Sequence, residues 1–103
     1  MSQKVFFTFG EAIAALKEGK CITRDGWNGN FYFVFMQVPS AVPEDVIPKM
    51  QSLPQSVKNH LGKRGGSISY RNQMALVYPD NTISGWSPSG TDALSEDWMI
   101  LEF

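Results

Sequence analysis

The chain has 103 residues, of which 43% are hydrophobic, so it is long enough for one domain with a modest core and too short for two. Its formal net charge of −1 argues against a nucleic-acid duplex or a membrane surface as the main partner, because both are bound through a basic excess. No apolar run approaches the ~20 residues that span a bilayer, no signal peptide is evident, and the single cysteine, Cys21, favours a reducing compartment such as the cytoplasm.

The N-terminal part of the chain predicts a short strand followed by an amphipathic helix. Residues 4–7 are β-prone, and Thr8 with Glu11 has the spacing of a capping box. Apolar residues then recur at the i, i+3, i+4, i+7 spacing of one helical face, and Gly19 offers a stop. We therefore expect a helix over residues 9–18 that packs on a sheet.

Two strands are expected next, at residues 20–24 and 31–38, and a turn joins them into a hairpin. The turn presents Trp27, with Gly26 and Gly29 supplying the backbone freedom that a tight reversal needs. Residues 31–35 are aromatic or β-branched without alternation, so both faces of this strand should be covered. The helix can cover one face, and a second layer or another subunit must cover the other.

Residues 39–66 are proline-rich and differ in character from the rest of the chain. Short helices are expected at residues 44–50 and 55–61, each with a proline near its start. A basic cluster follows, for which a solvated loop end and a phosphate clamp are both open; it consists of Lys58, His60, Lys63 and Arg64. We treat this segment as an insertion within a single domain that covers residues 1–103.

The C-terminal part of the chain predicts further strands and a second tryptophan-bearing loop. Strands are expected at residues 67–71, 73–78, 82–84 and 98–103, with a hairpin turn at residues 79–81. The loop before the last strand carries Trp86, and Thr91 or Asp92 can cap a brief turn over residues 93–97. The fold class is therefore α+β, a small antiparallel β-sheet with one main N-terminal helix and short helices in the central insertion.

Trp27 and Trp86, on polar loops that contain glycine, are candidate stacking surfaces for a flat ligand. Stacking on an aromatic side chain is worth ~1–3 kcal/mol per base. Four further side chains could supply charge or hydrogen bonds to a phosphate-bearing ligand, namely Arg24, Asn28, Arg71 and Thr91. This combination favours binding of a small nucleotide-like compound.

The sequence gives weak signals for catalysis or for a metal. One histidine and one cysteine cannot form a Cys/His metal site, and neither a P-loop nor a dinucleotide-binding glycine pattern is present. Asp92, Glu96 and Asp97 could act as an acid/base pair or hold magnesium, although carboxylates beside a helix start are more often caps. We therefore expect binding without turnover, with no cofactor and no metal.

Three ordered blocks of the sequence are distinctive: the helix-forming residues 9–20, the Thr-Arg-x-Gly-Trp-Asn-Gly turn at 23–29, and the Gly-Trp-x-Pro-Ser-x-x-Asp-x-Leu-x-x-Asp-Trp segment at 85–98. Together they resemble the second type of Thoeris anti-defence proteins, a small phage family. The resemblance implies a non-enzymatic protein that sequesters glycosyl-cyclic ADP-ribose, a signal made by a bacterial TIR-domain protein. It also implies that some relatives take up cyclic oligonucleotides of CBASS defence, and that the protein is a homotetramer in the cytoplasm of the infected host, with ligand pockets at protomer junctions.

Carried onto this sequence, the resemblance places the Trp27–Asn28 turn and the loop from Trp86 to Asp92, which includes Ser89, in the ligand pocket. Trp98 matches the closing Asp-Trp pair of the family, and we assign it first to the core. Residues 39–66 depart from the family pattern, which leaves the ligand preference open. Two alternatives also stay open: a hydrolase of a nucleotide signal that uses Asp92 or Asp97, and a phage structural or partner-binding protein.

Overall fold

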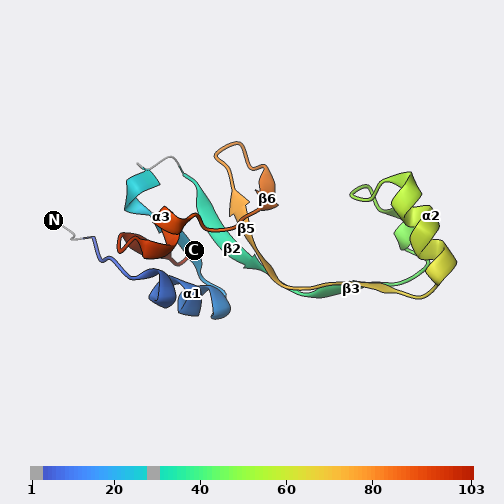
Figure 1. Cartoon of the computed structure of the whole chain (residues 1–103), viewed down its shortest axis with the longest axis horizontal. Coiled ribbons are helices and arrows are strands. Elements are labelled where there is room, and N and C mark those ends of the chain that lie inside the picture. The colour runs from blue at the N-terminus through green and yellow to red at the C-terminus, as the bar shows by residue number, and fades with distance from the viewer. Residues whose placement is uncertain (1–3, 28–30) are drawn as a thin grey trace. The chain divides into compact units, whose positions relative to one another are not determined.

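The computed structural model describes residues 4–27 and 31–103, and these form two compact units (Figure 1). The first unit comprises the described residues of Met1–Gln37 together with Gln73–Phe103, and the second comprises Val38–Asn72. None of the helices within the described ranges combines the length and the apolar character that a bilayer crossing requires.

The first unit is built on a five-stranded antiparallel sheet in the order β6-β5-β2-β1-β7. Its strands are β1 (Cys21–Arg24), β2 (Phe33–Gln37), β5 (Gln73–Val77), β6 (Ile83–Gly85) and β7 (Trp98–Leu101). Aromatic and aliphatic residues dominate the central strands, as suits a pleated and largely buried surface. Together with helix α1 (Phe9–Lys17), the sheet confirms the predicted α+β class and the predicted hairpin of β1 with β2 (Figure 1).

Helix α1 begins at the capping box predicted from Thr8 and Glu11. The backbone N–H of Glu11 donates to the Thr8 hydroxyl at 3.3 Å, and the backbone N–H of Thr8 donates to the Glu11 carboxylate at 2.8 Å. The strand predicted at residues 4–7 is wrong, because only Phe7 pairs there, through an isolated bridge to Trp98. The pairing stops because the cap at Thr8 turns the chain into the helix.

The hydrophobic core lies between α1 and one face of the sheet. Its buried side chains are Ala12, Ala15, Leu16, Ile22, Val34 and Trp98. Trp98 has no exposed surface, which confirms its predicted place in the core. Because side chains alternate between faces along a strand, the neighbours of Ile22 and Val34, which are Thr23 and Phe33, point to the face opposite α1.

The sheet also fixes where the chain leaves the first unit and where it returns. Gln37, the last residue of β2, is in register with Gln73, the first residue of β5. Their side chains meet as well, since the Gln73 amide nitrogen donates to the Gln37 amide oxygen at 2.8 Å. The two ends of the intervening segment are therefore held side by side.

The second unit contains a short hairpin and two helical segments. Strands β3 (Ser40–Val42) and β4 (Ile68–Tyr70) pair antiparallel, and the helical segments are η2 (Ile47–Lys49) and α2 (Gln55–Arg64). The helix predicted at residues 44–50 is only a 3₁₀ turn, because Pro48 has no N–H with which to continue an α-helical ladder. Helix α2 starts after Pro54 as predicted and runs to Arg64, beyond the predicted end at residue 61.

The β5–β6 hairpin and helix α3 (Gly90–Leu94) complete the first unit. The hairpin turn predicted at residues 79–81 is present, with Asn81 in the left-handed region at φ 66°. The predicted cap of the following helix is wrong, because Ser89 rather than Thr91 or Asp92 is the N-cap. Ser89 and Asp92 form a capping box, so the helical turn starts at Gly90 instead of residue 93.

Candidate functional site

The two tryptophans predicted to flank a ligand lie next to each other in the first unit. Trp27 ends the 3₁₀ turn η1 (Asp25–Trp27), and Trp86 follows β6. Their ring centroids are 6.2 Å apart with an angle of 81° between the planes, which is an edge-to-face contact. Both rings also contact the buried Trp98, at 5.4 and 6.0 Å. The indoles are half-buried against the core, and their orientation is fixed by this packing.

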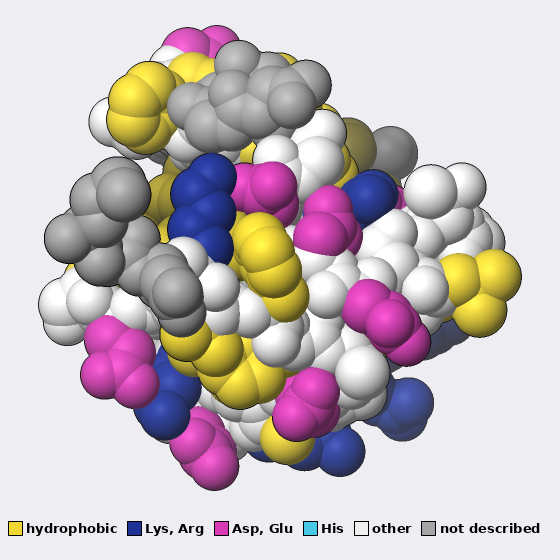
Figure 2. Space-filling view, turned by 90° about the vertical axis from the view of Figure 1, so that its left-hand side faces the viewer, with side chains coloured by type: hydrophobic (Ala, Val, Ile, Leu, Met, Phe, Trp, Pro, Cys, Tyr) yellow, Lys and Arg dark blue, Asp and Glu magenta, His cyan; other side chains and the backbone are white. Residues whose placement is uncertain are grey.

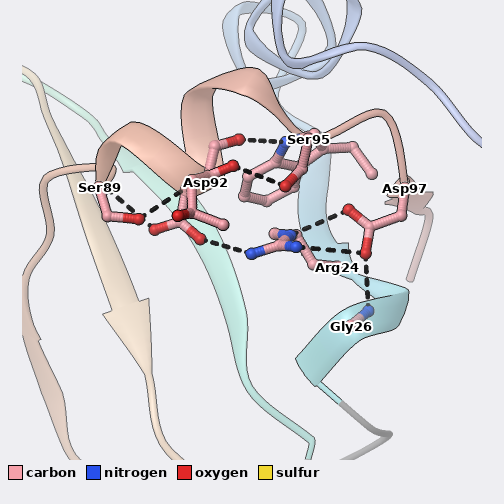
Figure 3. Close-up of polar contacts among 8 residues, drawn as sticks. Arg24, Gly26, Ser89, Asp92, Ser95 and Asp97 are labelled. Atoms are coloured by element: carbon pink, nitrogen blue, oxygen red, sulfur yellow. Dashed lines mark hydrogen bonds and ion pairs between the residues drawn. The ribbon is translucent and has the colours of Figure 1, made fainter.

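Arg24, at the end of β1, lies between two carboxylates that come from distant parts of the sequence (Figure 3). Its Nε donates to Asp97 Oδ1 at 2.9 Å, and its Nη1 donates to Asp92 Oδ1 at 2.8 Å. Its Nη2 also donates to Asp97 Oδ2, at the longer distance of 3.5 Å. Only 14% of the Arg24 side chain is exposed, so this network is largely shielded from water. Arg24 was predicted to bind an anionic ligand; in the structure its guanidinium pairs with Asp92 and Asp97, and the ligand contact stays a prediction.

The network joins the turn that carries Trp27 to the loop that carries Trp86. Asp97 Oδ2 accepts the backbone N–H of Gly26 at 2.8 Å, in the Trp27 turn. Asp92 Oδ2 accepts the backbone N–H of Ser89 at 3.0 Å, in the loop that follows Trp86 (Figure 3). The Arg24 guanidinium between them therefore holds both indole-bearing segments in one arrangement.

Gly26 and Trp98 complete this arrangement. A Cβ atom at Gly26 would lie 2.8 Å from Asp97 Oδ2 and 3.1 Å from Arg24 Nη2, so only glycine leaves room for the carboxylate. The indole N–H of Trp98 donates to the backbone carbonyl of Asp92 at 3.0 Å, which gives the buried ring a polar partner. We refer to Arg24, Asp92, Asp97, Trp27 and Trp86 as the tryptophan corner.

The charged side chains of the tryptophan corner hold one another in their ionised forms. Hydrogen bonding from Arg24 lowers the pKa of Asp97 below its ordinary value, against the opposing effect of burial. Burial disfavours the charged form of Asp92, but hydrogen bonds from Ser89 and Arg24 outweigh it and lower the pKa. The hydrogen bond to Asp97 in turn raises the pKa of Arg24. Both carboxylates are thus ionised at neutral pH, and neither is a ready proton donor.

The remaining predicted site residues lie in different places. Ser89 caps α3, and Thr91 is exposed on α3, where its backbone carbonyl accepts the Ser95 hydroxyl at 2.6 Å. Arg71 belongs to the second unit, and Asn28 lies outside the described residues. Within residues 4–27 and 31–103, no three histidine, cysteine or acidic side chains are grouped as a metal site requires. The structure therefore brings together five predicted residues, which are Arg24, Trp27, Trp86, Ser89 and Asp92.

Sequence reasoning missed a pocket of about 520 Å³ on the face of the sheet opposite α1. Its lining includes Thr23 and Phe33, together with Tyr32, Tyr78 and Asn81. The sequence signal closest to it is the apolar run at residues 31–35. That run predicted a strand with two covered faces, and the pocket lies on the face that α1 leaves open. Tyr78 and Asn81 belong to the β5–β6 hairpin, whose approach to β2 depends on the order of the strands.

One face of the molecule shows how its charges are distributed. In Figure 2, acidic and basic side chains are interspersed with hydrophobic ones, and no single sign of charge covers the surface drawn there. A nucleic-acid duplex is bound through a continuous basic surface, whereas a small ligand needs only a few local contacts. This face therefore suits a small ligand better than a polyanion.

Comparison with known proteins gives two matches. The model of the Thoeris anti-defense 2-like domain matches residues 7–101. A protein of Bacillus phage SP01 described as Thoeris anti-defense 2 is 33% identical over 98 residues, which cover 95% of this chain and 98% of the phage protein. The two chains are thus of closely similar length. The expectation that residues 39–66 depart from the family pattern stays a prediction.

Proposed function

This chain belongs to the Thoeris anti-defense 2-like family, and from that premise we propose that it binds a cyclic nucleotide immune signal and withholds it without cleaving it. The family assigns it an anti-defence role. The proposed ligand is glycosyl-cyclic ADP-ribose, with cyclic oligonucleotides of CBASS defence as a second class. The proposed site of action is the cytoplasm of the infected host, where the protein works as a homo-oligomer, expected to be a tetramer.

The observation that carries the proposal is the family match over nearly the whole chain, from residue 7 to residue 101. It includes both segments that form the tryptophan corner. Tight sequestration is favoured by surfaces that are already in the bound arrangement, because ordering loops on binding costs affinity. The contacts of Arg24 with Asp92 and Asp97, at 2.8 and 2.9 Å, hold the segments that carry the two tryptophans in place before a ligand binds.

The state of the carboxylates supports binding without turnover. A hydrolase that used Asp92 or Asp97 would need one of them free to exchange a proton or to hold a metal ion. Both are bound to Arg24, and the pKa of each lies below its ordinary value. Catalysis would first have to break these contacts, whereas stacking of a ligand on the exposed parts of Trp27 and Trp86 leaves them intact.

The experiment is a depletion and release assay. Purified protein is mixed with glycosyl-cyclic ADP-ribose and filtered, and the retained protein is heat-denatured so that chromatography can measure what it releases. Sequestration predicts stoichiometric depletion followed by release of the intact ligand. A new product in the released fraction would show catalysis and contradict the proposal, and an absence of depletion would remove this ligand.

A pair of variants tests whether the ligand binds at the tryptophan corner. Trp86→Ala removes an indole of the corner, while Leu94→Ala removes a side chain on nearby α3 that is 85% exposed. We expect Trp86→Ala to weaken depletion by about tenfold or more, as for loss of one stacked base, and Leu94→Ala to leave it unchanged. Equal depletion by both folded variants would place the ligand elsewhere.

A further inference from the structure

The pocket on the sheet face opposite α1 shares Arg24 with the tryptophan corner, and its other lining residues lie outside that corner. Its floor is apolar and comes from three strands, with Phe33 on β2 and Met99 and Leu101 on β7, beside Thr23 on β1. Its volume of about 520 Å³ lies within the range of roughly 300–1,000 Å³ that is typical of small-molecule sites. The floor is therefore large enough for a compound of nucleotide size.

Two aromatic pairs line this pocket. Tyr32 and Tyr78 have ring centroids 5.6 Å apart with an angle of 72° between the planes. Phe33 and Phe103 have centroids 5.3 Å apart with an angle of 69°. Such edge-to-face pairs fix the orientation of the rings, and the partner ring covers at most one face of each. The walls are thus suited to stacking.

The lining of the pocket also includes charged and polar residues, which are Lys4, Thr23, Arg24, Asp25 and Asn81. The Lys4 ammonium donates to Asp25 Oδ1 at 2.6 Å, which uses one of its three N–H groups. Asn81, whose side-chain amide can both donate and accept, belongs to the same lining. An ammonium suits an anionic substituent, and an amide suits the edge of a heterocycle, which presents a donor beside an acceptor.

We propose that this pocket binds a flat heteroaromatic ring of the nucleobase class that carries an anionic substituent. The ring lies on the floor of Phe33 and Met99 against Tyr32, the Asn81 amide contacts its edge, and Lys4 faces the anion. The proposal rests on the proposed function only in naming a nucleotide as the natural ligand. The pocket itself is argued from its own residues and can be tested without an immune signal.

The test uses the full-length protein and adenosine 5′-monophosphate as the probe. Protein labelled with ¹³C on the methionine methyl groups reports on the pocket through Met99, whose resonance is assigned with Met99→Leu. The indole N–H resonances of the three tryptophans report separately on the tryptophan corner. We expect the probe to shift the Met99 resonance in a saturable manner.

Substitutions then identify the residues that hold the ring. Tyr32→Ala should weaken binding about tenfold or more, whereas Tyr32→Phe, which keeps the ring, should bind within about threefold of the wild type. Asn81→Gly keeps the left-handed backbone at φ 66° and removes the amide, so it should also weaken binding. Thermal unfolding of each variant shows whether it is folded at the temperature of the titration. If Tyr32→Ala is unfolded at that temperature, Asn81→Gly provides the test of weakened binding.

Three results would overturn this inference. The first is no shift of Met99 with saturating probe, and the second is equal binding by wild type, Tyr32→Ala and Asn81→Gly. The third is a Met99 resonance that responds to dilution of the protein but not to the probe, which would mean that a second copy covers the pocket. Failure of the proposed function is distinguishable, because it appears as absence of glycosyl-cyclic ADP-ribose depletion whether or not the monophosphate binds.

Discussion

Replacing Arg24 by methionine should destabilise the protein by about 2–4 kcal/mol. The Arg24 and Asp92 side chains are each 14% exposed, and that of Asp97 is 29% exposed. The substitution leaves two carboxylates without their counter-ion. Loss of one partner from a fully buried pair costs about 3–5 kcal/mol, and we expect somewhat less here because Asp97 keeps contact with water.

Urea unfolding followed by tryptophan fluorescence measures this effect, since the indoles lie beside the network. In thermal unfolding, a loss of stability of this size should lower Tm by roughly 10 °C or more. Arg24→Lys is the matched control, because lysine keeps the charge but lacks the planar fork that reaches both carboxylates. It should lie between the wild type and Arg24→Met in stability.

The difference between the wild type and Arg24→Met should also depend on pH. The pKa values of Asp92 and Asp97 are lowered in the folded wild type, so their ionised forms stabilise the fold above their ordinary pKa of about 4. This contribution is lost as the pH falls through the lowered values, and the two proteins should converge in stability in acid. A difference below about 0.5 kcal/mol at neutral pH, or one that is unchanged in acid, would refute the role assigned to Arg24.

Three further substitutions test the local geometry by thermal or urea unfolding. Gly26→Ala, whose Cβ would lie 2.8 Å from Asp97 Oδ2, should cost about 1–3 kcal/mol, whereas Gly90→Ala meets nothing within 4 Å and should be near neutral; equal effects would contradict the close approach. Ser89→Ala removes the N-cap of α3 and should cost about 1 kcal/mol, and no measurable loss would mean that the capping box is dispensable. Trp27→Ala removes a half-buried ring and should cost about 2–4 kcal/mol, while a loss under 1 kcal/mol would place that ring outside the core packing.

The parts of the fold that depend on residues close in sequence could be predicted. The capping box at Thr8 and Glu11, the β1–β2 hairpin and the turn at residues 79–81 follow from local patterns, and each is present. The box at Ser89 and Asp92 has an acidic residue at the same spacing and could have been found in the same way. Strand β3 was missed because a three-residue strand among prolines carries little pattern of its own.

The candidate site could be predicted only as a set of residues. The sequence indicated that Trp27 and Trp86 share one environment, and they are in contact. It could not show that Arg24 lies between Asp92 and Asp97, because partners that are 68 and 73 residues apart meet only through the order of the strands. The internal ion pairs of Arg24 therefore depend on the pairing of β1 with β7, which residues far apart in the sequence do not reveal.

The pairing of Gln37 with Gln73 has an evolutionary consequence. A segment whose two ends are already bonded to each other adds little strain to its host, and its cost in chain entropy grows only slowly with its length. The segment between these two glutamines can thus be lengthened, shortened or replaced as a whole, while the register of β2 and β5 is retained. Such changes would leave in place the scaffold that supports the two indoles.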